Sequence, residues 1–216
     1  MRENYLLELG GENTNLGKYE ALELFKFQRY HPKLEKDYGK IIIISTSKEI
    51  DKRTINRLAM TRRLSKIIFS SKEDNIDAIL RNLDEIDIGE KSFAIRQIDG
   101  NKLKSEEISI LIGKKISINN KTELRDPDVT ILFYKNKKFN ISLTYDDWDT
   151  GYKKCLKHHI SRRPYFSPIS IHPRIARAMV FPGVKKPVSA LTEIGSRHCI
   201  SWEILSWEGA KNVEPG

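Results

Sequence analysis

The chain has 216 residues, enough for one or two small domains, with 39% hydrophobic and 31% charged residues. This composition is typical of a soluble globular protein, and it argues against a membrane protein because no apolar run approaches the roughly 20 residues of a membrane helix. Two cysteines, Cys155 and Cys199, are too few for a disulfide framework, and no apolar segment typical of a signal peptide follows Met1. We therefore expect a cytoplasmic protein with reduced thiols.

The net charge of +9 is concentrated in one segment of the chain. Residues 151–186 contain nine basic residues and no acidic residue, which leaves 29 residues of each sign elsewhere. A focused positive field attracts polyanions, so this basic segment favours contact with nucleic acid over an ordinary solvated surface. The nine residues are Lys153, Lys154, Lys157, Arg162, Arg163, Arg174, Arg177, Lys185 and Lys186.

The first 70 residues alternate between strand and helix patterns. We expect strands at Tyr5–Leu9, Ile41–Ile44 and Leu64–Phe69, and helices at Leu16–Phe27 and Lys48–Met60. Asn13 to Asn15 offer capping side chains for the first helix, and His31-Pro32 ends it. This order, with short connections, predicts an α+β domain of ferredoxin-like type over residues 1–70.

A second unit is expected over residues 71–150. The apolar spacing predicts helices at 71–83 and 105–118 and a strand at 92–98. Pro127 then excludes a helix through Leu124–Thr130, so this stretch is a turn that leads into a strand. The segments Val129–Tyr134 and Phe139–Tyr145 alternate with period two, which predicts a hairpin with one face on a core.

This β-α-β-β unit resembles the THUMP domain, a small RNA-binding module with a mixed sheet found in tRNA-modifying enzymes. The residues that carry the resemblance are Ser92–Arg96, Ile112–Ile116 and Leu124–Val129. The proline-rich stretch that follows, with Arg162–Phe166, Pro168 and His172–Val180, is similar to a linker in the archaeal tRNA guanosine-10 N2-methyltransferase family. The opening Tyr5–Glu12 also resembles the start of that family's N-terminal ferredoxin-like domain.

The resemblance implies that a methyltransferase domain using S-adenosylmethionine follows the linker. The sequence contains neither a glycine-rich turn after a suitable strand nor an Asp/Asn-Pro-Pro-aromatic loop. About 33 residues remain from Val184 onward, too few for a nucleotide-binding sheet. We therefore expect a basic linker at 151–186 and a truncated or aberrant tail at 187–216, with no cofactor site and no catalytic residue in this chain.

The resemblance also implies that tRNA is the partner, bound at its acceptor stem and 3′ CCA end, together with a methyltransferase domain or activator subunit. Phosphate pairing by basic side chains and base stacking on aromatic rings are the chemistry such contacts use. We expect RNA contacts from ten residues: Arg96, Lys102, Lys104, Lys114, Lys115, Arg125, Arg162, Arg163, Tyr165 and Phe166. Dipole compensation is the alternative role of the two helical lysines, and packing is that of the two aromatic rings.

Other functional assignments have less support from the sequence. A stand-alone THUMP subunit that delivers tRNA to a separate modifying enzyme remains an alternative, whereas a thiouridine synthase would need an ATP-binding Ser-Gly-Gly-type loop that is missing. Cys155, His158 and His159 lack the paired spacing of a zinc site, so no metal site is predicted. We expect Asp146, Asp147 and Asp149 to pair with the basic segment rather than to bind a cation.

Overall fold

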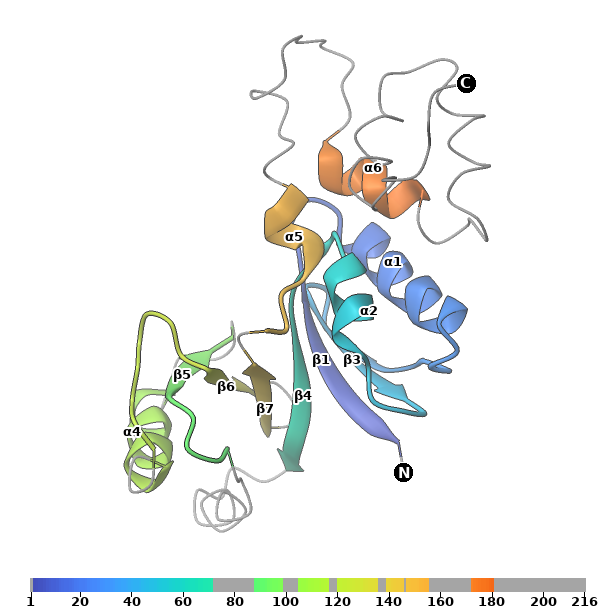
Figure 1. Cartoon of the computed structure of the whole chain (residues 1–216). Helices are drawn as coiled ribbons and strands as arrows, with labels where there is room; N and C mark the ends of the chain where they lie inside the picture. The colour runs from blue at the N-terminus through green and yellow to red at the C-terminus, as the bar shows by residue number, and fades with distance from the viewer. Residues whose placement is uncertain are drawn as a thin grey trace, which may run out of the picture.

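The computed structural model describes residues 2–71, 88–98, 105–116, 120–135, 139–145, 147–155 and 172–180 (Figure 1). These residues form a mixed α/β structure around one seven-stranded sheet. The strands are β1 (Glu3–Leu9), β2 (Lys33–Asp37), β3 (Ile41–Thr46), β4 (Thr61–Ser71), β5 (Phe93–Gln97), β6 (Val129–Lys135) and β7 (Phe139–Tyr145). The helices are α1 (Thr14–Phe27), α2 (Lys52–Arg57), α4 (Ser105–Ile116), α5 (Gly151–Lys154) and α6 (Pro173–Val180).

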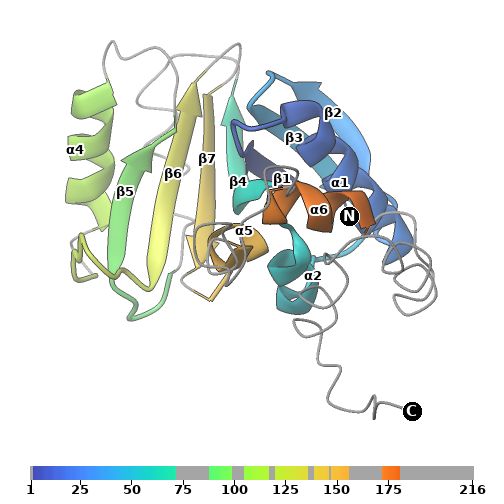
Figure 2. The same ribbon diagram turned by 90° about the horizontal axis from the view of Figure 1, so that it is seen from above.

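The strands follow the order β2-β3-β1-β4-β7-β6-β5, as Figure 2 shows from above. All neighbouring pairs are antiparallel except β5 and β6, which are parallel. Strand β4 is 11 residues long and pairs with β1 on one side and with β7 on the other. The two units expected from the sequence therefore share one continuous sheet through β4.

The helices α1, α2 and α4 cover a single face of this sheet. One apolar cluster joins α1 and α2 to the side chains of Tyr5, Leu7 and Ile44. A second cluster joins α4, through Ile112 and Ile116, to alternate residues of β5, β6 and β7. Tyr145 packs against both clusters, so the two cores lie on the same face of the sheet.

The other face of the sheet is curled. Tyr38, in the turn between β2 and β3, stacks at an angle on Tyr134 of β6, with ring centroids 5.7 Å apart. Strands β1, β4 and β7 separate β3 from β6 in the sheet, so this contact requires the sheet to bend towards its helix-free face. The apolar side chains Leu6, Ile41 and Leu132 fill the bend and are at most 5% exposed. We call this helix-free side the concave face.

Several expected elements are confirmed with changed limits. Asn13 caps α1 by accepting a hydrogen bond from the Leu16 N–H at 2.9 Å. The helix expected at 48–60 is confined to Lys52–Arg57, because Asp51 caps it by accepting from the Thr54 N–H at 2.7 Å. Ser71 belongs to β4, and the rest of the helix expected at 71–83 lies outside the described residues.

Strand β2 and helix α5 were not expected from the sequence. The five residues of β2 are Lys-Leu-Glu-Lys-Asp, which have little strand preference, and all but one of them are exposed. Hydrogen bonds to β3 at the edge of the sheet hold this segment as a strand. None of the helices in the described ranges has the length and apolarity needed to cross a membrane.

Candidate nucleic-acid interface

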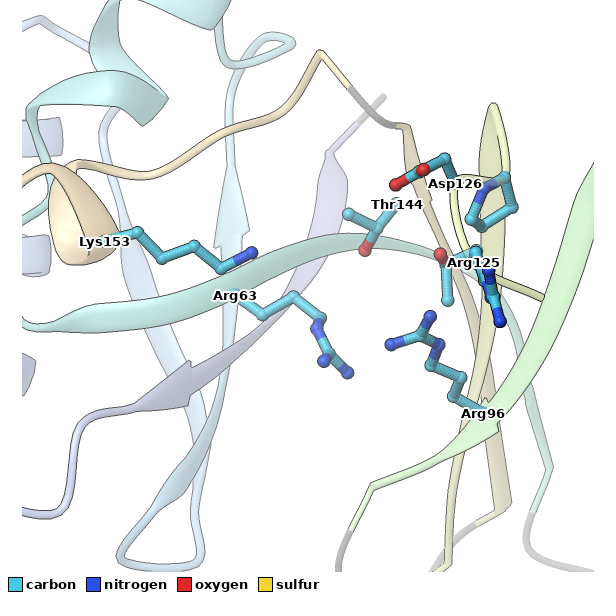
Figure 3. Close-up of a pocket in the computed structure, with 8 residues that line it drawn as sticks. Arg63, Arg96, Arg125, Asp126, Thr144 and Lys153 are labelled. Carbon is cyan, nitrogen blue, oxygen red and sulfur yellow. The ribbon is translucent and has the colours of Figure 1, made fainter.

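A basic pocket of about 310 Å³ opens on the concave face (Figure 3). It is bordered by strands β4 to β7, by the turn before β6 and by helix α5. Its lining residues are Arg63, Arg96, Arg125, Asp126, Pro127, Thr130, Thr144 and Lys153. Four cationic side chains and two hydroxyl groups thus meet in one hollow, beside a single carboxylate.

The alternation of side chains along β4, β6 and β7 determines which residues form the floor of the pocket. Leu64, Ile131 and Leu143 point into the cores under the helices, so their neighbours Arg63, Thr130 and Thr144 point to the concave face. Thr130 and Thr144 are direct partners in the β6–β7 register. The Thr144 hydroxyl donates to the Leu64 carbonyl at 3.0 Å, which ties the floor to β4.

The turn at Leu124–Asp128 forms one wall of the pocket. The Asp128 carboxylate accepts from the Ser92 N–H at 2.9 Å and from its hydroxyl at 2.6 Å, and these bonds hold the pKa of Asp128 below its usual value. The Arg96 guanidinium donates to the Leu124 carbonyl at 3.2 Å. These contacts fix the turn to the start of β5, so Arg125 stands beside Arg96 (Figure 3).

Arg63 and Arg96 make the pocket strongly electropositive. Their guanidinium groups point towards one another in Figure 3. Burial lowers the pKa of Arg63, and the charge of Arg96 lowers it further, against the opposing effect of Glu8 at 3.7 Å. Within the described part of the chain, Arg125 and Lys153 have no ion-pair partner. Such a group of donors suits oxyanions, above all phosphate.

The pocket contains two of the ten residues expected to contact RNA, Arg96 and Arg125. Lys114 is exposed on α4, which covers the opposite face of the sheet, so it lies apart from the pocket. The remaining seven cannot be placed: Lys102, Lys104, Arg162, Arg163, Tyr165 and Phe166 lie outside the described residues, as does the side chain of Lys115.

Sequence reasoning missed the other two cations of the pocket. Arg63 lies just before the strand expected at Leu64–Phe69 and gave no signal beyond its neighbour Arg62. Lys153 was counted in the basic segment, but that count does not place it near the THUMP-like unit. The pairing of β4 with β7 brings Arg63 to the pocket, and helix α5, which follows β7 in the chain, contributes Lys153.

Part of the basic segment has a structural role. Arg174 and Arg177 of α6 are only 4% and 7% exposed. Arg174 forms an ion pair with Glu12, and its guanidinium stacks 3.3 Å above the Tyr152 ring centroid. Burial would raise the pKa of Glu12, but a backbone hydrogen bond and the Arg174 charge together hold it below its usual value. Arg174 therefore attaches α6 to the N-terminal half of the chain.

Among the candidate metal ligands, Cys155, Asp147 and Asp149 are described, and they are engaged in packing and ion pairs. Cys155 is fully buried, and burial raises the pKa of its thiol to about 11. Asp147 pairs with Lys52, and Asp149 pairs with Lys154 at 3.5 Å. Where the chain is described, no three His, Cys, Asp or Glu side chains form a group suited to a metal ion.

Comparisons with known proteins give only distant structural likenesses. No protein-family model matches the chain, and no curated protein matches it. PH1313 from Pyrococcus horikoshii Ot3 is 18% identical with a TM-score of 0.48, over 66% of this chain and 54% of that one. A 4-thiouridine synthetase in complex with RNA and ATP is 12% identical with a TM-score of 0.48, over 67% of this chain and 41% of that one. TrmN from Thermus thermophilus is 14% identical with a TM-score of 0.48, over 65% of this chain and 45% of that one. The chain thus spans about half the length of these proteins.

Proposed function

We propose that this chain binds tRNA through the concave face, as the RNA-binding part of a tRNA-modifying system. The observation that carries the proposal is the pocket in which Arg63, Arg96, Arg125 and Lys153 converge. Arginine guanidinium forks and lysine ammonium groups are the groups that proteins use to hold RNA phosphates. The expected THUMP-like unit supplies Arg96, Arg125 and the two threonines.

The finer proposal is that the chain positions the acceptor stem and 3′ CCA end for a tRNA guanosine-N2 methyltransferase. The sequence resemblance supports this proposal. The antiparallel order β2-β3-β1-β4, with one helix after β1 and another after β3, supports a ferredoxin-like N-terminal unit. This proposal assigns the methyl transfer to a separate domain, as the sequence resemblance implies.

Binding of the full chain to tRNA with and without its 3′ CCA end, across a salt series, tests the proposal. We expect weaker binding without CCA, and binding that falls as salt rises because phosphate contacts release counterions. Arg96→Gln and Arg125→Gln should each weaken binding several-fold and reduce the salt slope by about one. Arg53→Gln is the matched control, because Arg53 is exposed on α2, on the opposite face of the sheet.

The outcomes separate the two levels of the proposal. Full binding by both pocket variants would refute the concave face as the RNA site. Equal binding of tRNA with and without CCA, still sensitive to Arg96→Gln, would refute acceptor-end recognition but keep the RNA site.

A further inference from the structure

The charge of the pocket exceeds what one internal RNA phosphate can balance. Its lining has four cations and one carboxylate, a net charge of +3. Glu8 pairs with Arg63 at 3.7 Å and with Arg62 at 3.4 Å outside the pocket lining, and counting Glu8 and Arg62 together leaves the surplus at +3. A phosphodiester carries about one negative charge, whereas a terminal phosphate carries about 1.5 to 2 at pH 7.

The arrangement of the donors also suits a terminal phosphate. Arg63 and Arg96 approach with like charges, and Figure 3 shows the Asp126 carboxylate on the other side of Thr144 from this pair. An anion between the two guanidiniums would offset their repulsion. A terminal phosphate offers three acceptor oxygens, against two unbridged oxygens in a diester, and can therefore meet several guanidinium forks at once.

The pocket has a floor and two side walls. The paired threonines of β6 and β7 form the floor, the turn at 125–127 forms one wall and Lys153 of α5 stands at the other. Beyond the floor, the bend of the sheet is filled by the apolar residues of the concave face. A chain end can enter such a hollow from one side, whereas an internal phosphate must leave room for a nucleotide on each side.

We propose that this pocket holds a terminal phosphomonoester, the 5′-phosphate of the bound RNA. The inference rests on the proposed function, since the ligand belongs to an RNA. In a mature tRNA the 5′-phosphate lies at the acceptor stem, beside the 3′ CCA end. The pocket would thus recognise the end of the acceptor stem through a group that internal RNA segments lack.

The test compares one acceptor-stem hairpin RNA ending in CCA in three forms: with a 5′-phosphate, with a 5′-hydroxyl, and with a 5′-hydroxyl and a 3′-phosphate. We expect the full chain to bind the 5′-phosphorylated form about tenfold more tightly than the other two, as one charge-assisted contact allows. Arg96→Gln should abolish this difference, and Arg53→Gln should keep it. The preference should also shrink between pH 7.5 and pH 5.5, because the second pKa of the phosphate is about 6.

Each other outcome has a definite meaning. Equal binding of the three forms, still weakened by Arg96→Gln, would overturn the terminal-phosphate site but leave the RNA-binding function standing. Preference for the 3′-phosphate would overturn the 5′ assignment. Micromolar binding of inorganic phosphate by the chain alone would identify a free-phosphate site and overturn the proposal. Failure of all three RNAs to bind would refute the proposed function and the inference with it.

Discussion

Glu20 is an acidic residue in an unusual place, inside the N-terminal core. Its side chain is 1% exposed, and its two carboxylate oxygens accept hydrogen bonds from the Ala59 and Met60 N–H groups, both at 2.8 Å. Burial raises the pKa of Glu20 to about 7, against the two N–H donors and the charge of Arg177, which lower it. The bonds hold the turn that leads into β4, at the cost of placing a titratable group in the core.

This burial makes the stability of the protein depend on pH. The folded-state pKa of about 7 lies above the ordinary value of 4.5, so the contribution of Glu20 is fully present below about pH 4.5 and is lost as the pH rises through 7. The two values correspond to a loss of about 3 kcal/mol in the free energy of unfolding. Urea unfolding of the wild type and of Glu20→Gln at pH 5 and pH 8 measures this loss of stability. The variant should show a flatter pH dependence, whatever its absolute stability, and an unchanged pH dependence would contradict the assignment.

At the scale of the element, α5 depends on a residue with no side chain. A Cβ at Gly151 would lie 2.8 Å from the Asn56 carbonyl oxygen and 3.1 Å from that of Leu58. We expect Gly151→Ala to cost about 1–3 kcal/mol, because backbone atoms cannot move aside as a flexible side chain can. Gly11→Ala is the matched control, since an added Cβ there meets nothing within 4 Å. Equal urea midpoints for the two variants would show that α5 does not pack this closely.

The elements differ in how well the sequence predicts them. The hairpin of β6 and β7 and the helix α4 follow from apolar periodicity. The expectation that the hairpin has one face on a core was too narrow, because Leu132 and Tyr134 are also buried, on the concave face. The strand β2 does not follow from such a pattern, since pairing with β3 holds it extended and its own side chains do not. Likewise Arg96 and Arg125 could be named from the THUMP resemblance, whereas Arg63 joins them only through the β4–β7 pairing of distant segments. Register between such segments is a tertiary property that no local pattern contains.

At the scale of the whole molecule, the continuous sheet joins the two domains expected from the sequence. Strand β4 is hydrogen-bonded to both halves, Tyr145 packs on both cores, and Tyr38 contacts Tyr134 across the concave face. Unfolding one half would expose backbone groups and apolar side chains of the other. We therefore expect the described parts of the two halves to unfold together, as one cooperative unit.

A substitution in one half should then reduce protection in the other. Leu7 is fully buried under the N-terminal helices, so Leu7→Ala should cost about 2–5 kcal/mol. Hydrogen exchange of the most protected β6 amides, which belong to the other half, should accelerate in proportion to that loss because their exchange requires global unfolding. Leu34→Ala on the edge strand β2, where Leu34 is 38% exposed, is the control and should leave β6 exchange nearly unchanged. If Leu7→Ala accelerated exchange in β1 and β3 but left β6 exchange unchanged, the two halves would unfold independently, although their strands pair in one sheet. The pocket, which takes Arg63 from one half and Arg96 from the other, would then form only when both are folded.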